Sequence, residues 1–374
     1  MSDIPSGGRR KPTAKKEFSL DDFKKKSNIE NKKDKPLTWY KTSPALQEAT
    51  GLPGFARGYV GLSRGFSNTG KSTSVTEAAI AAQKMGDLVI FIDTENNIGT
   101  NRLQMMGFDV DNFVYIDNEH LLHNFGRIKD KDRSEAAIED MADCIKHFLS
   151  QQEAGDLPRN ICFIIDSLGT LNCVKSVKAD DKDGPNNNMW NAGAFEASFK
   201  YLLNSTIPAS RKENKPYINT IIGVQKIWLD SMAGGMPVVK HKGGEAFFFG
   251  ARLIYHHGGT MTHGTKKIMA TSRKRDVVFG IESKVSVVKN QIDGPLGGIN
   301  MEGKLISTPH GFIGVEKEDK DNYKNDHMKY FRDVLGGDVD ISEIKEEYDE
   351  NDDGLNFDVD KETGEIREWK QKHF

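Results

Sequence analysis

The sequence has little cysteine, no long apolar run and little net charge, and each shortage excludes a class of protein. Three cysteines among 374 residues, none at metal-ligand spacing, exclude a disulfide scaffold or zinc motif and favour reduced thiols. No segment reaches the roughly 18 apolar residues of a membrane-spanning helix. The first residues also lack the apolar segment of a secretory signal. We therefore expect a cytoplasmic protein without a membrane partner.

The net charge of −3 conceals an asymmetry along the chain. Residues 1–36 contain 11 Lys and Arg against 6 Asp and Glu, whereas residues 316–374 contain 10 against 20. A basic arm and an acidic tail are typical of proteins that contact nucleic acid, although two solvated tails would have the same composition. A short helix after Ser19, with Phe23 on its apolar face, could dock on a neighbouring subunit or pack on its own domain.

One short segment, Gly65–Ser72, matches the phosphate-binding P-loop pattern G-x-x-x-x-G-K-[ST]. Its glycines allow backbone N–H groups to form an anion nest, Lys71 can reach the β- and γ-phosphates of ATP, and Ser72 can ligate Mg²⁺. Flanking patterns predict a strand before the loop and a helix after it, which a chance Gly/Ser turn would lack. The predicted nucleotide-binding residues here are Gly65, Ser67, Asn68, Thr69, Gly70, Lys71, Ser72 and Thr73.

Short apolar runs alternate with helical patterns, and this alternation predicts the fold class. Runs typical of buried parallel strands occur at residues 88–93, 161–166 and 220–225. Helical spacing occurs at residues 73–85, 135–151 and 189–204, and further strands of a more antiparallel edge are expected at 251–257, 267–271 and 284–290. The patterns predict an α/β P-loop ATPase core with a mostly parallel twisted sheet flanked by helices.

Composition and pattern together divide the chain into three parts. Residues 1–38 form a basic arm with a short helix and a linker, and residues 39–315 form the ATPase core. Residues 316–374 form an acidic C-terminal segment.

Three polar residues end predicted strands near the P-loop. Asp166 follows five apolar residues, the Walker B pattern of a carboxylate that holds the Mg²⁺ shell, although a strand-ending carboxylate could look the same. Glu95 could orient the water that attacks the γ-phosphate, and Gln225 could sense that phosphate. By position alone, a surface carboxylate and a capping amide are equally compatible with these two residues.

Two long polar stretches follow the Walker B segment, at residues 179–190 and 227–244. Stretches of this length without regular structure are usually functional or disordered. The second combines apolar residues that could insert between bases with lysines that could contact phosphates, or it is simply a flexible surface loop.

The order of these motifs resembles the RecA family of DNA strand-exchange ATPases, with details closest to the phage UvsX branch. The resemblance covers about residues 39–315. It runs from the P-loop through I-D-T-E, M-G-F-D, I-I-D-S-L-G and a strand-ending Gln to V-V-K-N. It implies a RecA-type core that uses ATP and Mg²⁺.

The resemblance also implies roles for individual residues. Lys71 and Ser72 bind phosphate and Mg²⁺, Asp166 is the Walker B aspartate, and Lys289 extends across a filament interface to a neighbour's ATP. The implied catalytic residues are Glu95, Lys71, Gln225 and Lys289, with Gln225 coupling ATP to the second DNA-binding loop. The implied DNA-binding residues are Met189, Trp190, Met232, Met236, Lys240 and Lys242.

Two positions depart from the family pattern. Gln291 stands where relatives have a second lysine that acts across the interface, so one interface cation is missing. Arg102 stands where an aromatic residue stacks on adenine, and its planar guanidinium could still stack there.

We predict a recombinase that forms filaments on single-stranded DNA with ATP, pairs it with homologous double-stranded DNA and exchanges strands. DNA-dependent hydrolysis yields ADP and phosphate. Single-strand-binding and mediator proteins are candidate partners, and a phage source would place the protein in host cytoplasm. The alternatives are a hexameric helicase-like motor with the same core and an ATP-switched DNA scaffold with little turnover. A small-molecule kinase would leave the two long stretches unexplained.

Overall fold

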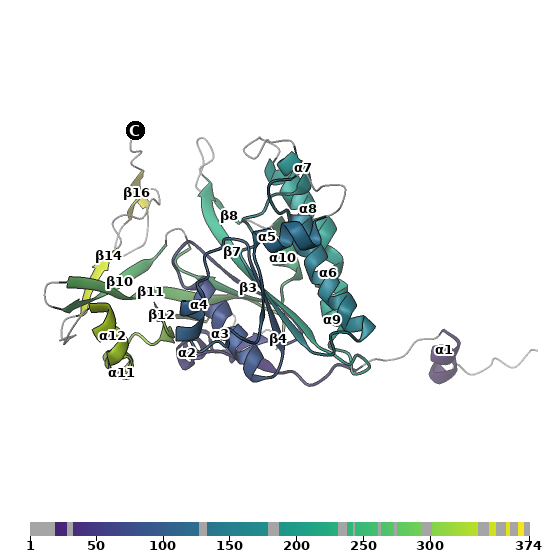
Figure 1. Ribbon diagram of the computed structural model, residues 1–374, viewed down its shortest axis with the longest axis horizontal. Coiled ribbons are helices and arrows are strands. Elements are labelled where there is room, and N and C mark those ends of the chain that lie inside the picture. The colour runs from purple at the N-terminus through teal and green to yellow at the C-terminus, as the bar shows by residue number, and fades with distance from the viewer. Residues whose placement is uncertain are drawn as a thin grey trace, which may run out of the picture.

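The chain folds around one large twisted sheet with helices on both faces (Figure 1). The computed structural model describes residues 19–27, 33–126, 133–178, 187–230, 238–241, 244–260, 263–272, 275–292, 301–335, 344–348, 357–359 and 366–369. The predicted fold class, α/β with a mostly parallel sheet and antiparallel edge strands, is confirmed. Among the described residues, no helix has both the length and the apolar character that a membrane crossing requires.

The parallel part of the sheet positions the candidate site. Its strands are, in spatial order, β9 (Leu253–His257), β3 (Val60–Gly65), β7 (Asn219–Asp230), β6 (Ile161–Asp166), β4 (Leu88–Asp93) and β5 (Val114–Ile116). Parallel strands end at the same edge, so the segments that follow β3, β4, β6 and β7 meet there.

Strands buried on both faces explain the continuous apolar runs of the sequence. In β6, alternate side chains point to opposite faces. Ile161, Phe163 and Ile165 therefore belong to one hydrophobic cluster, and Cys162 and Ile164 belong to the other.

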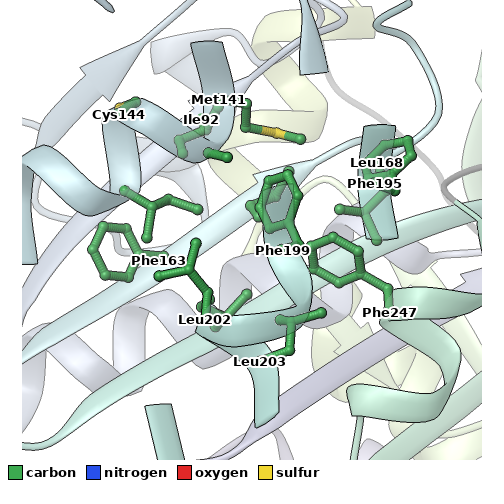
Figure 2. Packing of buried hydrophobic residues seen from close by; sticks show 14 of the residues in the cluster. Ile92, Met141, Cys144, Phe163, Leu168, Phe195, Phe199, Leu202, Leu203 and Phe247 are labelled. Carbon is green, nitrogen blue, oxygen red and sulfur yellow. The ribbon is translucent and has the colours of Figure 1, made fainter. Parts of the chain in front are cut away.

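Different helices cover the two faces of the sheet. One face packs against α2 (Pro44–Thr50), α3 (Lys71–Lys84) and α4 (Thr100–Met105). The other packs against α6 (Ile138–Ala154), α8 (Asn187–Tyr201) and α10 (Gly244–Gly250). Figure 2 shows the hydrophobic cluster between the sheet and these last three helices. In it, Phe199 of α8 faces Phe247 of α10, with ring centroids 4.9 Å apart. This packing fixes both ends of the segment between α8 and α10.

An antiparallel extension continues the sheet beyond β9. Its strands are β10 (Thr265–Ser272), β11 (Arg275–Asn290), β12 (Glu302–Thr308), β13 (Gly311–Ile313) and β14 (Ile344–Tyr348), which pairs with β10. Helices α11 (Lys317–Asp326) and α12 (Met328–Leu335) share a small core with it, in which Phe279 of β11 stacks on Phe331 of α12 at 5.7 Å. The first part of the acidic segment is thus packed on the sheet, while the domain boundary at residue 315 stays a prediction.

The structure corrects several predicted element bounds. The stretch after Ile227 is not irregular throughout, because β7 continues to Asp230 and pairs with β8 (Val238–His241) as an antiparallel hairpin. Likewise, α8 begins at Asn187, inside the stretch predicted to be irregular up to residue 190. The two strands pair close together in the sequence, Ile227 with His241 and Asp230 with Val238. Strand β8 has only four residues, which is too few for a sequence pattern to indicate a strand.

Shorter elements complete the described chain. They are β1 (Trp39–Lys41), β2 (Gly54–Ala56), α5 (Asn118–His120), the π-helices Leu121–Phe125 and Leu202–Thr206, α7 (Val174–Lys178), α9 (Ile207–Ala209), β14 (Ile344–Tyr348), β15 (Phe357–Val359) and β16 (Ile366–Trp369). The predicted helix after Ser19 is α1 (Leu20–Lys26), where Leu20 and Phe23 are 54% and 51% exposed. Docking of this helix on another subunit stays a prediction.

Candidate nucleotide-binding site

The P-loop joins β3 to α3 and depends on two glycines. A Cβ atom on Gly65 would lie 2.1 Å from the carbonyl oxygen of His257. Gly70 has φ +94°, and a Cβ there would lie 2.8 Å from the ring of Phe312. Both positions exclude larger residues, so the glycines allow the loop to curl between its neighbours.

A cavity of about 520 Å³ lies over this loop at the carboxyl edge of the parallel strands. It brings together many of the predicted residues from four separate segments. They are Ser67, Asn68, Lys71, Ser72, Glu95, Arg102 and Asp166. A larger cavity, of about 800 Å³, is lined by residues of α6 and of the segment 201–219 but contains none of the predicted residues. We therefore place the chemistry in the smaller cavity.

Lys71 is buried and already bonded within the loop. Its Nζ donates a hydrogen bond to the carbonyl oxygen of Phe66. Burial lowers the pKa of Lys71 to about 8, although the carboxylate of Asp166 opposes the shift. A phosphate oxygen could replace the carbonyl as acceptor and would favour the charged form of the ammonium.

The donor set beside Lys71 fits a magnesium ion. Burial raises the pKa of Asp166 to about 6, and a hydrogen bond from the Ser72 hydroxyl opposes this rise. A hydroxyl and a carboxylate are hard oxygen donors, and Mg²⁺ usually takes one or two such ligands together with substrate phosphates and water. Ser72 and Asp166 could hold the ion in this way.

Glu95 is held at the edge of the cavity by hydroxyl groups from the segment after β6. Its Oε1 accepts hydrogen bonds from Ser167 Oγ at 2.6 Å and Thr170 Oγ1 at 3.2 Å, and its Oε2 accepts one from Asn97 at 3.2 Å. Burial alone would raise the pKa of Glu95, but these bonds outweigh it and lower the pKa. An ionised, oriented carboxylate is suited to activate water.

Sequence reasoning gave no role to Asp93, which shapes the loop that carries Glu95. Its carboxylate accepts hydrogen bonds from the backbone N–H groups of Glu95 at 3.1 Å and Ile98 at 3.0 Å, and from the Tyr115 hydroxyl at 2.9 Å. A strand-ending Asp followed by polar residues is typical of such turns, so the signal was present in the sequence. No sequence pattern indicated that Ser167 and Thr170 would donate hydrogen bonds to Glu95.

Some of the predicted nucleotide-binding and catalytic residues do not line the cavity. They are Gly65, Thr69 and Gly70 of the P-loop itself, together with Thr73, Gln225 and Lys289. Thr73 lies behind the cavity, where its hydroxyl accepts a hydrogen bond from Arg102 Nη2 at 3.0 Å. Gln225 is buried in β7, one residue before Lys226, which does line the cavity. Lys289 donates hydrogen bonds to the carbonyl oxygens of Phe248 at 2.9 Å and Phe249 at 3.2 Å, at the end of α10. A contact from Lys289 to a neighbour's ATP involves a second subunit and stays a prediction.

The described DNA-binding candidates lie beyond the same edge of the sheet. Met189 is 65% exposed in the first turn of α8, and the ring of Trp190 lies 4.0 Å from Lys175 Nζ. Lys240 is exposed on β8. Figure 1 shows the β7–β8 hairpin and the start of α8 projecting from the same end of the molecule. Met232, Met236 and Lys242 lie outside the described residues.

A buried histidine lies beside the first residue of the P-loop. His257 pairs with Gly65 in the sheet, and neither of its ring nitrogens has a hydrogen-bond partner within the described ranges. Burial, with a smaller contribution from the charge of Lys71, lowers the pKa of His257 from 6.5 to about 3. The unfolded chain therefore binds more protons between these values, and the free energy of unfolding falls as pH falls through this window.

We expect His257→Phe to reduce this acid sensitivity. In the wild type, His257 lowers the free energy of unfolding by about 1.4 kcal/mol for each pH unit below 6.5. Between pH 7.5 and 5, the free energy of unfolding of the variant should therefore fall by about 2 kcal/mol less. Denaturant unfolding at both pH values measures the difference. His120→Phe, at an exposed histidine beside Asp117, is the control. Equal losses in all three proteins would show that His257 is not the source.

Comparison with known proteins gives distant similarity to RecA proteins. The chain is 26% identical over 286 residues to Protein RecA of Streptomyces ambofaciens, covering 72% of this chain and 65% of that protein. It is 24% identical over 288 residues to the Francisella philomiragia protein (73% and 67%) and 24% over 285 residues to that of Wigglesworthia glossinidia brevipalpis (74% and 73%). No protein-family model matches.

These similarities agree with the resemblance found in the motif order. The chain spans about two thirds of the length of the first two relatives, so their whole activity does not transfer directly to it. None of the three relatives is a UvsX protein.

Proposed function

We propose that the chain is an ATP-dependent recombinase of the RecA type. It assembles on single-stranded DNA as a filament, pairs that strand with a homologous duplex and exchanges strands. The observation that carries the proposal is the meeting of Lys71, Ser72, Glu95 and Asp166 around one cavity, at the sheet edge from which the hairpin projects. The similarity to RecA proteins supports it.

The proposed chemistry is hydrolysis of ATP to ADP and phosphate, without a covalent intermediate. Bound Mg²⁺, held by Ser72 and Asp166, would supply positive charge to the phosphates. Lys71 binds the β- and γ-phosphates, and the P-loop N–H groups orient them. Glu95, which Ser167 and Thr170 hold in place, accepts a proton from the attacking water. Arg102 lines the same cavity and is proposed to stack on the base.

The geometry also supports a link between nucleotide and DNA. Gln225 immediately precedes Lys226 in β7, and the paired part of the β7–β8 hairpin begins at Ile227. A rearrangement at Gln225 on loss of the γ-phosphate would reach the hairpin through the strand itself. We propose that the hairpin, with Lys240, and the start of α8, with Met189 and Trp190, contact DNA. Single-strand-binding and mediator partners, the UvsX branch, a phage source and a host-cell location are further parts of this proposal.

One observation favours a second candidate, a DNA-binding scaffold that ATP switches with little turnover. Gln291 Oε1 accepts a hydrogen bond from Arg252 Nη1 of the same chain at 2.7 Å. A neutral side chain bonded in this way adds no positive charge to a neighbour's phosphates, so assembly would accelerate hydrolysis less.

ATP hydrolysis with and without single-stranded DNA tests the proposal. We expect DNA to stimulate turnover by a factor on the order of 10–100, the usual range of coupling between two sites. Stimulation should decline steeply as salt rises, because lysines that neutralise phosphates release counterions. Heparin, a polyanion without bases, is the control and should stimulate little. Strand exchange between homologous substrates then separates a recombinase from a motor.

Two outcomes would redirect the proposal. DNA binding with negligible turnover would favour the scaffold. Turnover indifferent to DNA would instead remove the DNA-binding role from the hairpin and from the start of α8.

A further inference from the structure

Lys226 is a cavity residue to which the sequence motifs gave no role. Strand β7 pairs in parallel with β3, and their register places Lys226 opposite Gly65, the first residue of the P-loop. At this point β3 ends, whereas β7 continues to Asp230. Lys226 therefore lies beside the first residue of the phosphate-binding loop.

The alternation of side chains along β7 gives the direction of the Lys226 side chain. Ile222 and Val224 belong to the cluster packed against the P-loop helix α3. Alternate residues share one face of a strand, so Lys226 lies on that face. Val224 and Lys226 both line the cavity, while Gln225 between them does not.

The charges around the cavity leave Lys226 available for an anion. Three carboxylates line it, those of Asp93, Glu95 and Asp166, together with three cations, Lys71, Arg102 and Lys226. Arg102 already bonds to Thr73, and Lys71 already bonds to Phe66. Lys226 is exposed and, in the described part of the chain, is held by no ion pair.

Lys226 is near enough to influence both key residues of the site. Burial is the largest cause of the lowered pKa of Lys71, and the charge of Lys226 adds to that lowering. Burial alone would raise the pKa of Glu95. Hydrogen bonds from hydroxyl and amide groups lower this pKa, and the charge of Lys226 lowers it further. These influences agree with the position inferred from the strand register.

We infer that Lys226 is a second cation for the terminal phosphate and binds a γ-phosphate oxygen from the β7 side when a nucleoside triphosphate occupies the P-loop. The inference rests on the proposed nucleotide site and adds a specific property to it. A diphosphate lacks the group that Lys226 contacts, so this lysine discriminates triphosphate from diphosphate. A solvated lysine at the end of a strand would contribute equally little to the binding of both nucleotides.

Nucleotide affinities of Lys226→Met test the inference. We expect binding of a slowly hydrolysed triphosphate, ATPγS, to weaken about 10-fold, the usual effect of losing a charge-assisted hydrogen bond. Binding of ADP should change less than about 2-fold, because the other phosphate contacts remain. Lys226→Arg keeps the charge and should retain most of the triphosphate affinity. Titration of a fluorescent nucleotide, with ATPγS and ADP as competitors, gives both constants.

Lys84→Met is the matched control, because it removes the same charge from the opposite, exposed end of α3. Thermal melting of each variant reports whether it folds. An unchanged ratio of ATPγS to ADP affinity in Lys226→Met, or the same change in Lys84→Met, would overturn the inference and leave the nucleotide site intact. Failure of the wild-type protein to bind either nucleotide would instead overturn the proposed function.

Discussion

Replacement of Lys71 by alanine is expected to abolish measurable ATP hydrolysis, with a loss of at least about 10²- to 10³-fold. Lys71 is the buried cation of the cavity, and its ammonium can exchange the Phe66 carbonyl for phosphate oxygens. Its charge acts in a partly desolvated site, where an electrostatic contact is stronger than in water. Steady-state hydrolysis in saturating single-stranded DNA measures the loss.

The stability of the Lys71→Ala protein should separate a chemical defect from misfolding. Burial lowers the pKa of Lys71 to about 8, so its charged form is disfavoured in the folded protein. Removal of a group whose charged form is disfavoured by burial should not lower the melting temperature of the nucleotide-free protein. Lys84→Ala, at the far end of α3, is the control and should hydrolyse ATP normally. Turnover within a few-fold of wild type in Lys71→Ala would place the chemistry outside this cavity.

Replacement of Glu95 by glutamine is expected to stop hydrolysis and to preserve binding of ATP and DNA. The amide oxygen can still accept hydrogen bonds from Ser167 and Thr170, but the amide cannot take a proton from water. Loss of a general base typically costs about 10²- to 10⁴-fold in rate. Single-turnover hydrolysis measures the rate, and retention of labelled single-stranded DNA with ATP measures binding. The variant should remain on DNA longer than the wild type.

Glu48→Gln, on the exposed side of α2, is the matched control for the loss of a negative charge. It should retain wild-type rates. Rapid turnover by Glu95→Gln would remove Glu95 from its proposed role and would leave the assignments of Lys71 and Asp166 unaffected. Loss of nucleotide binding in the same variant would point to a structural role for the carboxylate.

Local chemistry in the sequence predicted the central elements of the site. The P-loop pattern located the junction of β3 and α3, since tight phosphate loops need glycine at fixed positions. Continuous apolar runs predicted β4 and β6, because strands buried on both faces cannot alternate with polar residues. Asp166 ends one run, and Glu95 lies two residues beyond Asp93, the end of the other, so both were expected at one sheet edge, where both line the cavity.

Short strands and long-range packing were not predictable from the same patterns. The hairpin of β7 and β8 fell within a predicted irregular stretch, and β12 and β13 were not predicted at all. Strands β8 and β13 have four and three residues, too few to show a strand period, and β12 pairs not only with β13 but also with the more distant β11. For the same reason, the packing of Phe331 on Phe279 in the extension had no local signal.

The sequence by itself determined the α/β fold class, the position of the phosphate loop and the residue types available for phosphate chemistry. Only the tertiary structure decided which of those residues act together. It brought Ser167 and Thr170 to Glu95 across 72 and 75 positions of the chain, and it placed Lys226 beside Gly65. These contacts depend on strand order and register, which long-range packing of the whole sheet selects, so no local periodicity records them.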